Sequence, residues 1–203
     1  MSKSQETKVL IAQALKELMP ELPFDKISVT RICQEAQVHR KTFYYHFQDK
    51  YDLVNWIYDT EVAELKQLDQ NSRDPEEVLA FFKAICHYLY NNRAFYHKAL
   101  QIEGQNSFLD HFYSLTRPLV RERLALLMGT SKIDDFTTDF FTDAIVAALE
   151  NWLLQKHPMT ADDFIHRVLR IIHTSAETIA ALDRKYAYEL EFGLKNDQPD
   201  SQG

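Results

Sequence analysis

Apolar residues recur along the chain at the three- and four-residue spacing of amphipathic helices. The first stripe predicts a helix from about Ser4 to Met19, which Pro20 and Pro23 should stop because proline has no amide hydrogen and restricts the residue before it. A short second helix is expected from the N-cap at Ser28 to about Ala36. After a break at Gln37, a third is expected from His39 to Phe47. Three helices with a tight turn between the second and third form the helix-turn-helix pattern.

The remainder predicts longer helices. An aspartate followed by proline at Asp74-Pro75 is a strong start signal, and Ser107 and Thr160 each have an aspartate three residues later, as in a capping box. Pro118 should kink or divide the helix that contains it. The expected helices span about residues 53–70, 75–90, 107–128, 135–156 and 160–182.

These elements predict an all-α protein with a small head on a helical bundle. We expect a helix-turn-helix domain over residues 1–50 and a helical dimerisation and regulatory domain over residues 51–185. Residues 186–203 are polar, and we expect this tail to be disordered.

Composition excludes several classes of site. The chain has four glycines, and the closest two are ten positions apart, so no glycine-rich phosphate loop or nucleophile elbow can form. Cys33 and Cys86 are too few for a four-thiolate zinc site, and both fit buried free thiols. We expect no metal and no cofactor. No apolar run approaches the ~20 residues of a membrane span, and no signal peptide is evident, so a soluble cytoplasmic protein is expected.

Charge is unevenly placed. The net charge is -7, but residues 1–50 hold eight Lys/Arg against six Asp/Glu, a balance of +2, and the rest carries -9. A mildly basic head on an acidic body suits a head that touches phosphates and a body that does not, although chance would also explain so small an excess.

The third expected helix has two different faces. Phe43 and Phe47 are four residues apart and can bury together against the first helix. Arg40, Lys41, Tyr44 and Tyr45 share another face, and none of them requires burial. A major groove accepts one helix, and guanine offers paired acceptors that fit an arginine. The alternative is that the tyrosines pack in the core and the cations are solvated.

Two runs resemble a known family. The segment SVTRI from Ser28, leading to Val38, and the segment TFYYHFQDKYDL from Thr42 closely resemble the DNA-binding domain of TetR-type transcriptional regulators. The resemblance covers roughly residues 5–55. It implies that DNA bases are contacted by Arg40, Lys41, Thr42 and Tyr45, and DNA phosphates by Thr30, Tyr44, His46 and Lys50.

One residue departs from the family pattern. The family usually has glycine at the turn, where this chain has Gln37, and a left-handed conformation costs a non-glycine residue roughly 1–2 kcal/mol. A different turn geometry is therefore an open alternative. The longer run from Phe43 to Ile57 resembles a subgroup that includes regulators of dihydroxyacetone kinase operons. Some of its members activate through a partner protein, so the resemblance implies no sign of regulation.

Two helices of the body carry apolar residues over a broad arc, which predicts burial on more than one side. Paired across a two-fold axis, they would form a four-helix interface. The alternative is that one chain buries both helices internally. The residues that we expect at the dimer interface are Phe141, Ile145, Trp152, Val168, Ile172 and Ile179.

Residues 81–113 are rich in aromatic residues and histidines, which suit either an effector pocket or ordinary core packing, and packing is favoured. Asp135, Asp139 and Asp143 fit a solvated face better than a cation site.

No nucleophile–base spacing supports an enzyme. The expected function is a homodimeric regulator that binds double-stranded operator DNA and responds to a small-molecule or protein effector. The alternative is an interaction bundle with weak or lost DNA binding.

Overall fold

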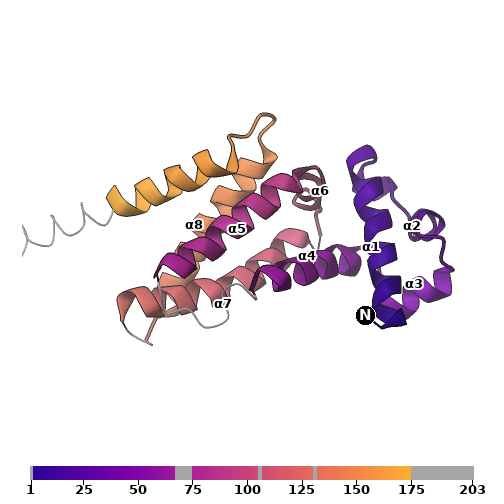
Figure 1. Cartoon of the computed structure of the whole chain (residues 1–203), viewed down its shortest axis with the longest axis horizontal. Helices are drawn as coiled ribbons and strands as arrows, with labels where there is room; N and C mark the ends of the chain where they lie inside the picture. Colours follow the sequence, from indigo (N-terminus) through magenta and orange to yellow (C-terminus); the bar gives the residue numbers. More distant parts are fainter. Residues whose placement is uncertain (1, 67–74, 105–106, 130–131, 175–203) are drawn as a thin grey trace, which may run out of the picture. The chain divides into compact units, whose positions relative to one another are not determined.

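The computed structural model describes residues 2–66, 75–104, 107–129 and 132–174. These residues form helices and connecting turns, with no strand among them, which confirms the all-α expectation (Figure 1). The chain divides into two compact units, Met1–Ala161 and Asp162–Gly203. The expected polar tail and Ile179 lie outside the described residues. No described helix is long and apolar enough to cross a membrane.

The helix-turn-helix part is built from α1 (Lys3–Glu21), the 3₁₀ helix η1 (Phe24–Lys26), α2 (Val29–Glu35) and α3 (Arg40–His46). Ser28 caps α2 as expected, because its hydroxyl accepts from the Arg31 amide. Helix α1 ends at Glu21, so it extends two residues beyond the expected end at Met19, includes Pro20 in its last turn and stops before Pro23. The Leu22 amide donates to the Leu18 carbonyl at 3.0 Å and closes this end of the helix.

The body follows as α4 (Lys50–Lys66), α5 (Pro75–Asn91), α6 (Arg93–Ala99), α7 (Phe108–Met128) and α8 (Asp135–Leu154), with residues 161–174 also helical. The expected helix starts near Pro75, Ser107 and Thr160 are confirmed. Pro118 lies within one continuous helix, α7, which it does not divide. The short helix α6 has no counterpart among the expected elements.

Helix α1 packs on α2, α4 and α6, so it joins the helix-turn-helix part to helices that follow it within the unit Met1–Ala161. Figure 1 shows α4 leading from the helix-turn-helix part to α5, α6, α7 and α8. Lys98 of α6 donates to the carbonyls of Pro20 and Leu22 at 2.9 and 3.1 Å, which satisfies the carboxyl end of α1. Arg93 of the same helix donates to Leu153 at the end of α8. Helix α6 therefore ties the ends of α1 and α8 together.

Aromatic residues build the core of the body. Tyr58 of α4 packs edge-on against Tyr96, Phe108 and Phe112, with ring centroids 5.4–6.0 Å apart. Trp152 is 1% exposed, lies stacked near Tyr90, and donates its indole N–H to the Met159 carbonyl. The region rich in aromatics is thus largely packed core, the favoured expectation.

Both cysteines are free and buried, as expected. Two of the aspartates on α8 form ion pairs with an arginine of α7. Arg117 of α7 pairs with Asp135 and Asp139, and no cluster of metal-ligating side chains occurs in the described part of the chain.

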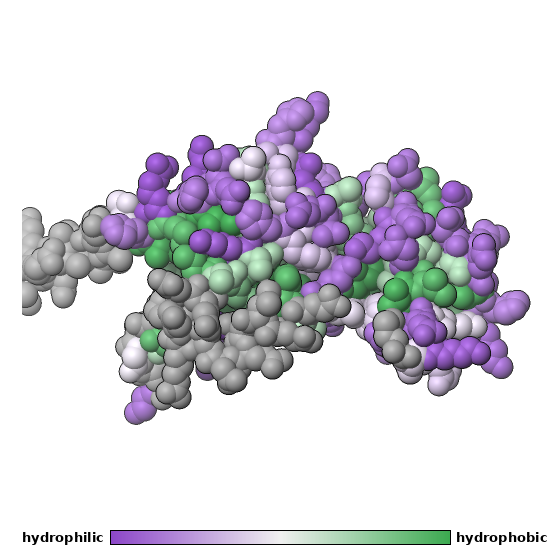
Figure 2. Space-filling model, in the orientation of Figure 1, coloured by the Kyte–Doolittle hydropathy of each residue, from purple (hydrophilic) through white to green (hydrophobic). Residues whose placement is uncertain are grey.

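The surface keeps apolar side chains exposed in a few places. Figure 2 shows green apolar surface between purple hydrophilic side chains on the face that it draws. The exposed large apolar residues of the described part are Val9, Leu10, Tyr44, Tyr45, Leu126, Phe136, Phe140, Phe141, Ile171 and Ile172.

Candidate nucleic-acid interface

The turn between α2 and α3 contains a residue in the left-handed conformation, and this residue is not glycine. Gln37 has a φ of 52°, and the Val38 amide donates to the Cys33 carbonyl at 2.9 Å. This hydrogen bond closes the end of α2 and turns the chain toward α3. Gln37 therefore does not abolish the left-handed turn, and the alternative of a different local geometry does not hold.

One side of α3 anchors it to the domain. Phe43 is fully buried and Phe47 is 2% exposed, and their ring centroids lie 5.7 Å apart. The Phe47 ring also contacts Trp56 of α4 edge-on at 5.5 Å. The sequence-based assignment of these two phenylalanines to the core is confirmed, so the opposite side of α3 points outward.

That opposite side carries cations and phenols in solvent. Arg40 and Lys41 are exposed, Tyr44 is 50% exposed and Tyr45 is 81% exposed. The alternative in which both tyrosines pack in the core is therefore excluded. We call these four residues the α3 ridge. Its tip is Tyr45, a large aromatic side chain that folding alone leaves in water.

Arg40 and Tyr44 hold each other in place along the ridge. An Arg40 guanidinium nitrogen donates to the Tyr44 hydroxyl at 3.4 Å, and the guanidinium carbon lies 5.8 Å from the ring centroid. Both contacts are weak, so they orient the arginine without consuming its donors. Most of its five N–H groups remain available to an acceptor outside the protein.

The other polar residues expected at DNA differ in their exposure. Thr30 on α2 is exposed, whereas Thr42 and His46 on α3 are partly buried. Burial and the Lys8 ammonium lower the pKa of His46, which favours its neutral form. Sequence reasoning missed Lys8, whose ammonium lies 5.7 Å from the Phe47 ring centroid. No local pattern joins residues so far apart in the chain.

Lys50 has a structural partner set that the sequence did not reveal. Its ammonium donates to the carbonyls of Phe24 and Ile27 at 2.6 and 2.9 Å, and lies 4.2 Å from the centroid of the Phe24 ring. Partial burial lowers the pKa of Lys50. Because an ammonium has three donors, one remains for a phosphate, while two hold η1 against the start of α4.

The residues expected at a dimer interface fall into different environments. Phe141 on α8 is 43% exposed and Ile172 is 59% exposed, while Ile145 and Val168 are partly buried. Trp152 lies inside the single chain, where its indole stacks near Tyr90, so it offers a partner almost no surface.

Comparison with known proteins agrees with this geometry. Residues 11–57 match the bacterial regulatory proteins of the tetR family, and residues 76–174 match a transcriptional regulator C-terminal region. The dhaKLM operon transcriptional activator DhaS of Lactococcus lactis subsp. lactis (strain IL1403) is 35% identical over 116 residues, which are 56% of this chain and 57% of that protein. The matched part thus spans less than two thirds of that relative.

Solved structures share the fold along most of the chain. A structure of the dihydroxyacetone kinase operon activator DhaS has a TM-score of 0.60 and 22% identity, covering 85% of this chain and 97% of that one. A TetR transcriptional regulator from Streptococcus agalactiae 2603V has a TM-score of 0.60 and 25% identity, covering 84% and 95%. The FadR regulator of Bacillus subtilis, solved with stearoyl-CoA, has a TM-score of 0.55 and 13% identity, covering 78% and 95%.

Proposed function

Because this chain belongs to the TetR family of bacterial regulatory proteins and is a DNA-binding transcriptional regulator rather than an enzyme, we propose that it acts as a homodimer on operator DNA in the cytoplasm. The observation that carries the proposal is the α3 ridge, in which two cations and two phenols stand exposed while Phe43 and Phe47 anchor the helix from behind.

We assign base contacts to Arg40, Lys41, Thr42 and Tyr45 because they occupy or adjoin this ridge. An arginine with free donors matches the O6 and N7 acceptors of guanine in the major groove. We assign phosphate contacts to Thr30, Tyr44, His46 and Lys50, as the family resemblance implies. Such contacts fix the register of the helix without reading sequence.

The proposed dimer uses the exposed apolar face of α8. Phe136, Phe140 and Phe141 are 80%, 59% and 43% exposed, and three phenylalanines on one helix are costly to leave in water. Two recognition helices on one dimer would reach half-sites about 34–36 Å apart. We include Ile145, Val168 and Ile172 in this interface, and we leave out Trp152 because the chain itself buries it.

Oligomeric state tests the dimer directly. Phe141→Asp should convert the dimer to a monomer in sedimentation velocity, because a carboxylate would be buried in the interface without a partner. Leu10→Asp, at a residue that is 55% exposed on α1, is the matched control and should leave the dimer intact. A wild-type chain that sediments as a monomer at micromolar concentration would overturn this part of the proposal.

Regulation is proposed through the body, by a small molecule or a protein. The mechanism is a population shift, in which an effector changes operator affinity by its different affinity for two separations of the DNA-binding domains. The similarity to an operon activator named DhaS is compatible with activation, and nothing in α3 distinguishes an activator from a repressor.

Salt dependence of binding separates a DNA reader from an interaction bundle. The affinity of the protein for an operator selected from genomic fragments should fall roughly 10³–10⁵-fold between about 50 and 200 mM salt if the protein contacts about six to ten phosphates. A flat response near background would favour the interaction bundle.

Arg40 tests the division between base and phosphate contacts. Arg40→Ala should weaken binding to the operator by about 1–3 kcal/mol more than it weakens binding to random DNA, since the variant loses a bidentate guanine contact. Lys156→Ala, at an exposed cation after α8, is the control and should leave both affinities unchanged. Equal losses on the two DNAs after Arg40→Ala would show that Arg40 contacts phosphate only.

A further inference from the structure

Lys8 of α1 lies where three helices meet. Its ammonium is 5.7 Å from the centroid of the Phe47 ring, which directly follows α3, and 5.5 Å from the centroid of the Trp56 ring on α4. The two rings contact each other edge-on at 5.5 Å. The negative potential of the ring faces attracts the ammonium and keeps it at the carboxyl end of α3, beside the start of α1 (Figure 1).

The charge of Lys8 is not balanced by an acid. Its side chain is partly buried, and it makes no hydrogen bond or ion pair with any residue that the structure describes. Lys16, farther along the same helix, instead pairs with Glu61 at 2.6 Å. The Lys8 ammonium is not among the described buried polar atoms that lack a partner, so it reaches water. An anion outside the protein can therefore approach it.

His46, the last residue of α3, is a second polar group at this place. Burial and the Lys8 ammonium lower the pKa of His46, so the two groups are close enough to interact. A neutral imidazole has one N–H donor and no charge, whereas an ammonium has three donors and a full charge. One phosphate group, with its negative oxygens, can accept hydrogen bonds from both.

The length of α3 brings this place near DNA. The helix has seven residues and is therefore about 10 Å long at about 1.5 Å per residue, which is comparable with a major groove about 12 Å wide. When the α3 ridge enters the groove, groups at the end of the helix come near the phosphates that border it. Lys8 is such a group, although it belongs to α1.

We propose that Lys8 binds a phosphate group of the operator backbone together with His46. This contact is additional to those assigned above, and it rests on the proposed function. Lys8 supplies the charge and His46 supplies one hydrogen bond. Because phosphates are the same along any sequence, the contact strengthens binding to operator and random DNA alike.

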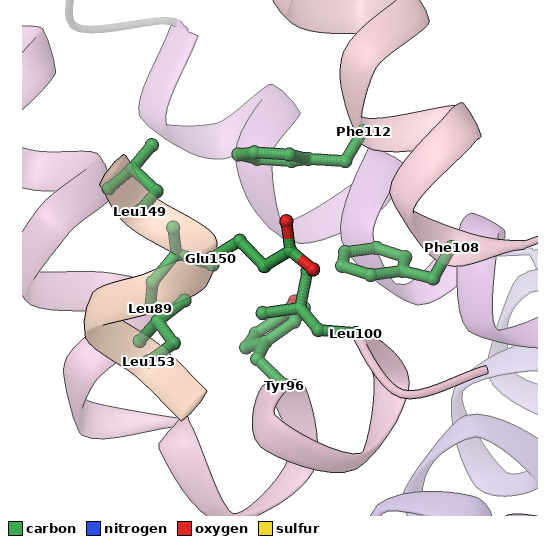
Figure 3. A pocket seen from close by; sticks show the side chains of 8 residues that line it. All are labelled: Leu89, Tyr96, Leu100, Phe108, Phe112, Leu149, Glu150 and Leu153. Carbon is green, nitrogen blue, oxygen red and sulfur yellow. The ribbon is translucent and has the colours of Figure 1, made fainter. Parts of the chain in front are cut away.

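Aromatic surroundings by themselves do not indicate a DNA contact. Figure 3 shows a carboxylate, that of Glu150 on α8, beside the rings of Phe108 and Phe112 in the body. A carboxylate repels phosphate, and these side chains belong to the packed core. The inference for Lys8 depends on its positive charge and on its place at the end of the outward-facing helix α3.

The salt dependence of DNA binding by the full chain at about pH 8 tests the contact through Lys8→Met. Methionine keeps an unbranched apolar stem against the two rings and removes the charge. On both DNAs, the slope of log affinity against log salt should become shallower by about one, and affinity should fall on the order of tenfold at roughly 0.1 M salt. His46 is neutral at this pH because its pKa lies below 6.5, so the slope counts Lys8 alone.

Three further variants separate charge, position and partner. Lys8→Arg keeps the charge and should keep the slope. Lys16→Met removes a lysine of the same helix whose charge Glu61 balances, and it should also keep the slope. His46→Ala should weaken binding without changing the slope. If Lys8 and His46 share one phosphate, the loss in the double variant should differ by at least about twofold from the product of the single losses.

Urea unfolding of Lys8→Met accompanies the DNA titrations. An unchanged slope, with or without a loss of stability, would show that Lys8 only packs on the two rings and would overturn the phosphate contact. Equal changes of slope in Lys8→Met and Lys16→Met would also overturn it, because net charge alone would explain both. Single losses that simply multiply in the double variant would overturn the shared phosphate.

The wild-type chain separates this inference from the proposed function. A wild type that binds DNA with a steep slope, which Lys8→Met retains, contradicts only the contact of Lys8. A wild type without salt-dependent binding to DNA contradicts the proposed function instead.

Discussion

The ammonium of Lys16 on α1 lies 2.6 Å from the carboxylate of Glu61 on α4, with 23% and 30% of the two side chains exposed. The Tyr88 hydroxyl donates to the other oxygen of the same carboxylate. One acid therefore joins the DNA-binding domain to the body, and the pair is shielded enough from water to contribute to stability.

Lys16→Met should lower the free energy of unfolding by about 1–3 kcal/mol, because it removes a charged donor from a partly buried carboxylate. Urea unfolding measures the change. Lys26→Met is the control, since the Lys26–Asp25 pair is 3.5 Å apart with side chains 74% and 69% exposed. This exposed pair should change stability by less than about 0.5 kcal/mol. Equal effects of the two substitutions would contradict a stabilising role for the Lys16–Glu61 pair.

Gln37→Gly should raise the free energy of unfolding by about 0.5–1 kcal/mol, since glycine relieves the left-handed strain but loses more entropy on folding. Gln34→Gly makes the same chemical change on exposed helical backbone in α2 and should lower stability by about 0.5–1 kcal/mol. Thermal unfolding of the two variants measures both changes. A decrease for both would mean that Gln37 carries no strain.

Lys50→Met should lower the free energy of unfolding by about 1–3 kcal/mol, because the carbonyls of Phe24 and Ile27 lose their charged donor. Lys41→Met removes an exposed cation of the ridge and should change stability by less than about 0.5 kcal/mol while weakening DNA binding. Urea unfolding and DNA titration of both variants separate the roles. If Lys50→Met left the free energy of unfolding unchanged, Lys50 would have no structural role, and only the proposed phosphate contact would remain.

We expect the protein to lose stability at alkaline pH because the thiol of Cys86 is buried. Burial raises the pKa of its thiol from 9.0 to about 12. Above pH 9 the unfolded thiol loses its proton while the folded thiol keeps it, so stability is fully present below pH 9 and falls as pH rises toward 12, by about 1.4 kcal/mol per pH unit.

Cys86→Ala tests this titration by urea unfolding at several values of pH from 8 upward. The variant should lose stability less steeply above pH 9 than the wild type, by the contribution of one proton. Cys33, Tyr58 and Tyr96 also have raised pKa values and contribute to the slope that remains. Identical slopes for variant and wild type would exclude Cys86 as the titrating group.

Local sequence rules predicted most of the helices. Caps such as Ser28 and Ser107 act on amides within three residues, and the Phe43–Phe47 spacing places both rings on one face, so neighbouring residues contain the whole signal. The same rules found the α3 ridge, because a face without apolar residues has no reason to be buried.

Local rules failed where contacts are distant in sequence. Helix α6 depends on Arg93 and Lys98, which bind carbonyls about 60 and 76–78 residues away, and no nearby pattern indicates them. The family resemblance assigns Lys50 to a phosphate contact, whereas its nearest partners in the structure are the carbonyls of Phe24 and Ile27. Trp152 belongs to a broad apolar arc, and that arc does not show which of its sides the chain itself buries.

The sequence by itself determined that the chain is helical, that it carries a helix-turn-helix and that α3 presents Arg40 and Tyr45 outward, because periodicity and capping act over a few residues. Tertiary structure alone decided which charges pair and which rings surround Glu150. It also decided how Lys16 and Glu61 connect the DNA-binding domain to the body. Such contacts depend on the packing of whole helices, and their free energies come from burial and charge proximity that only the folded chain creates.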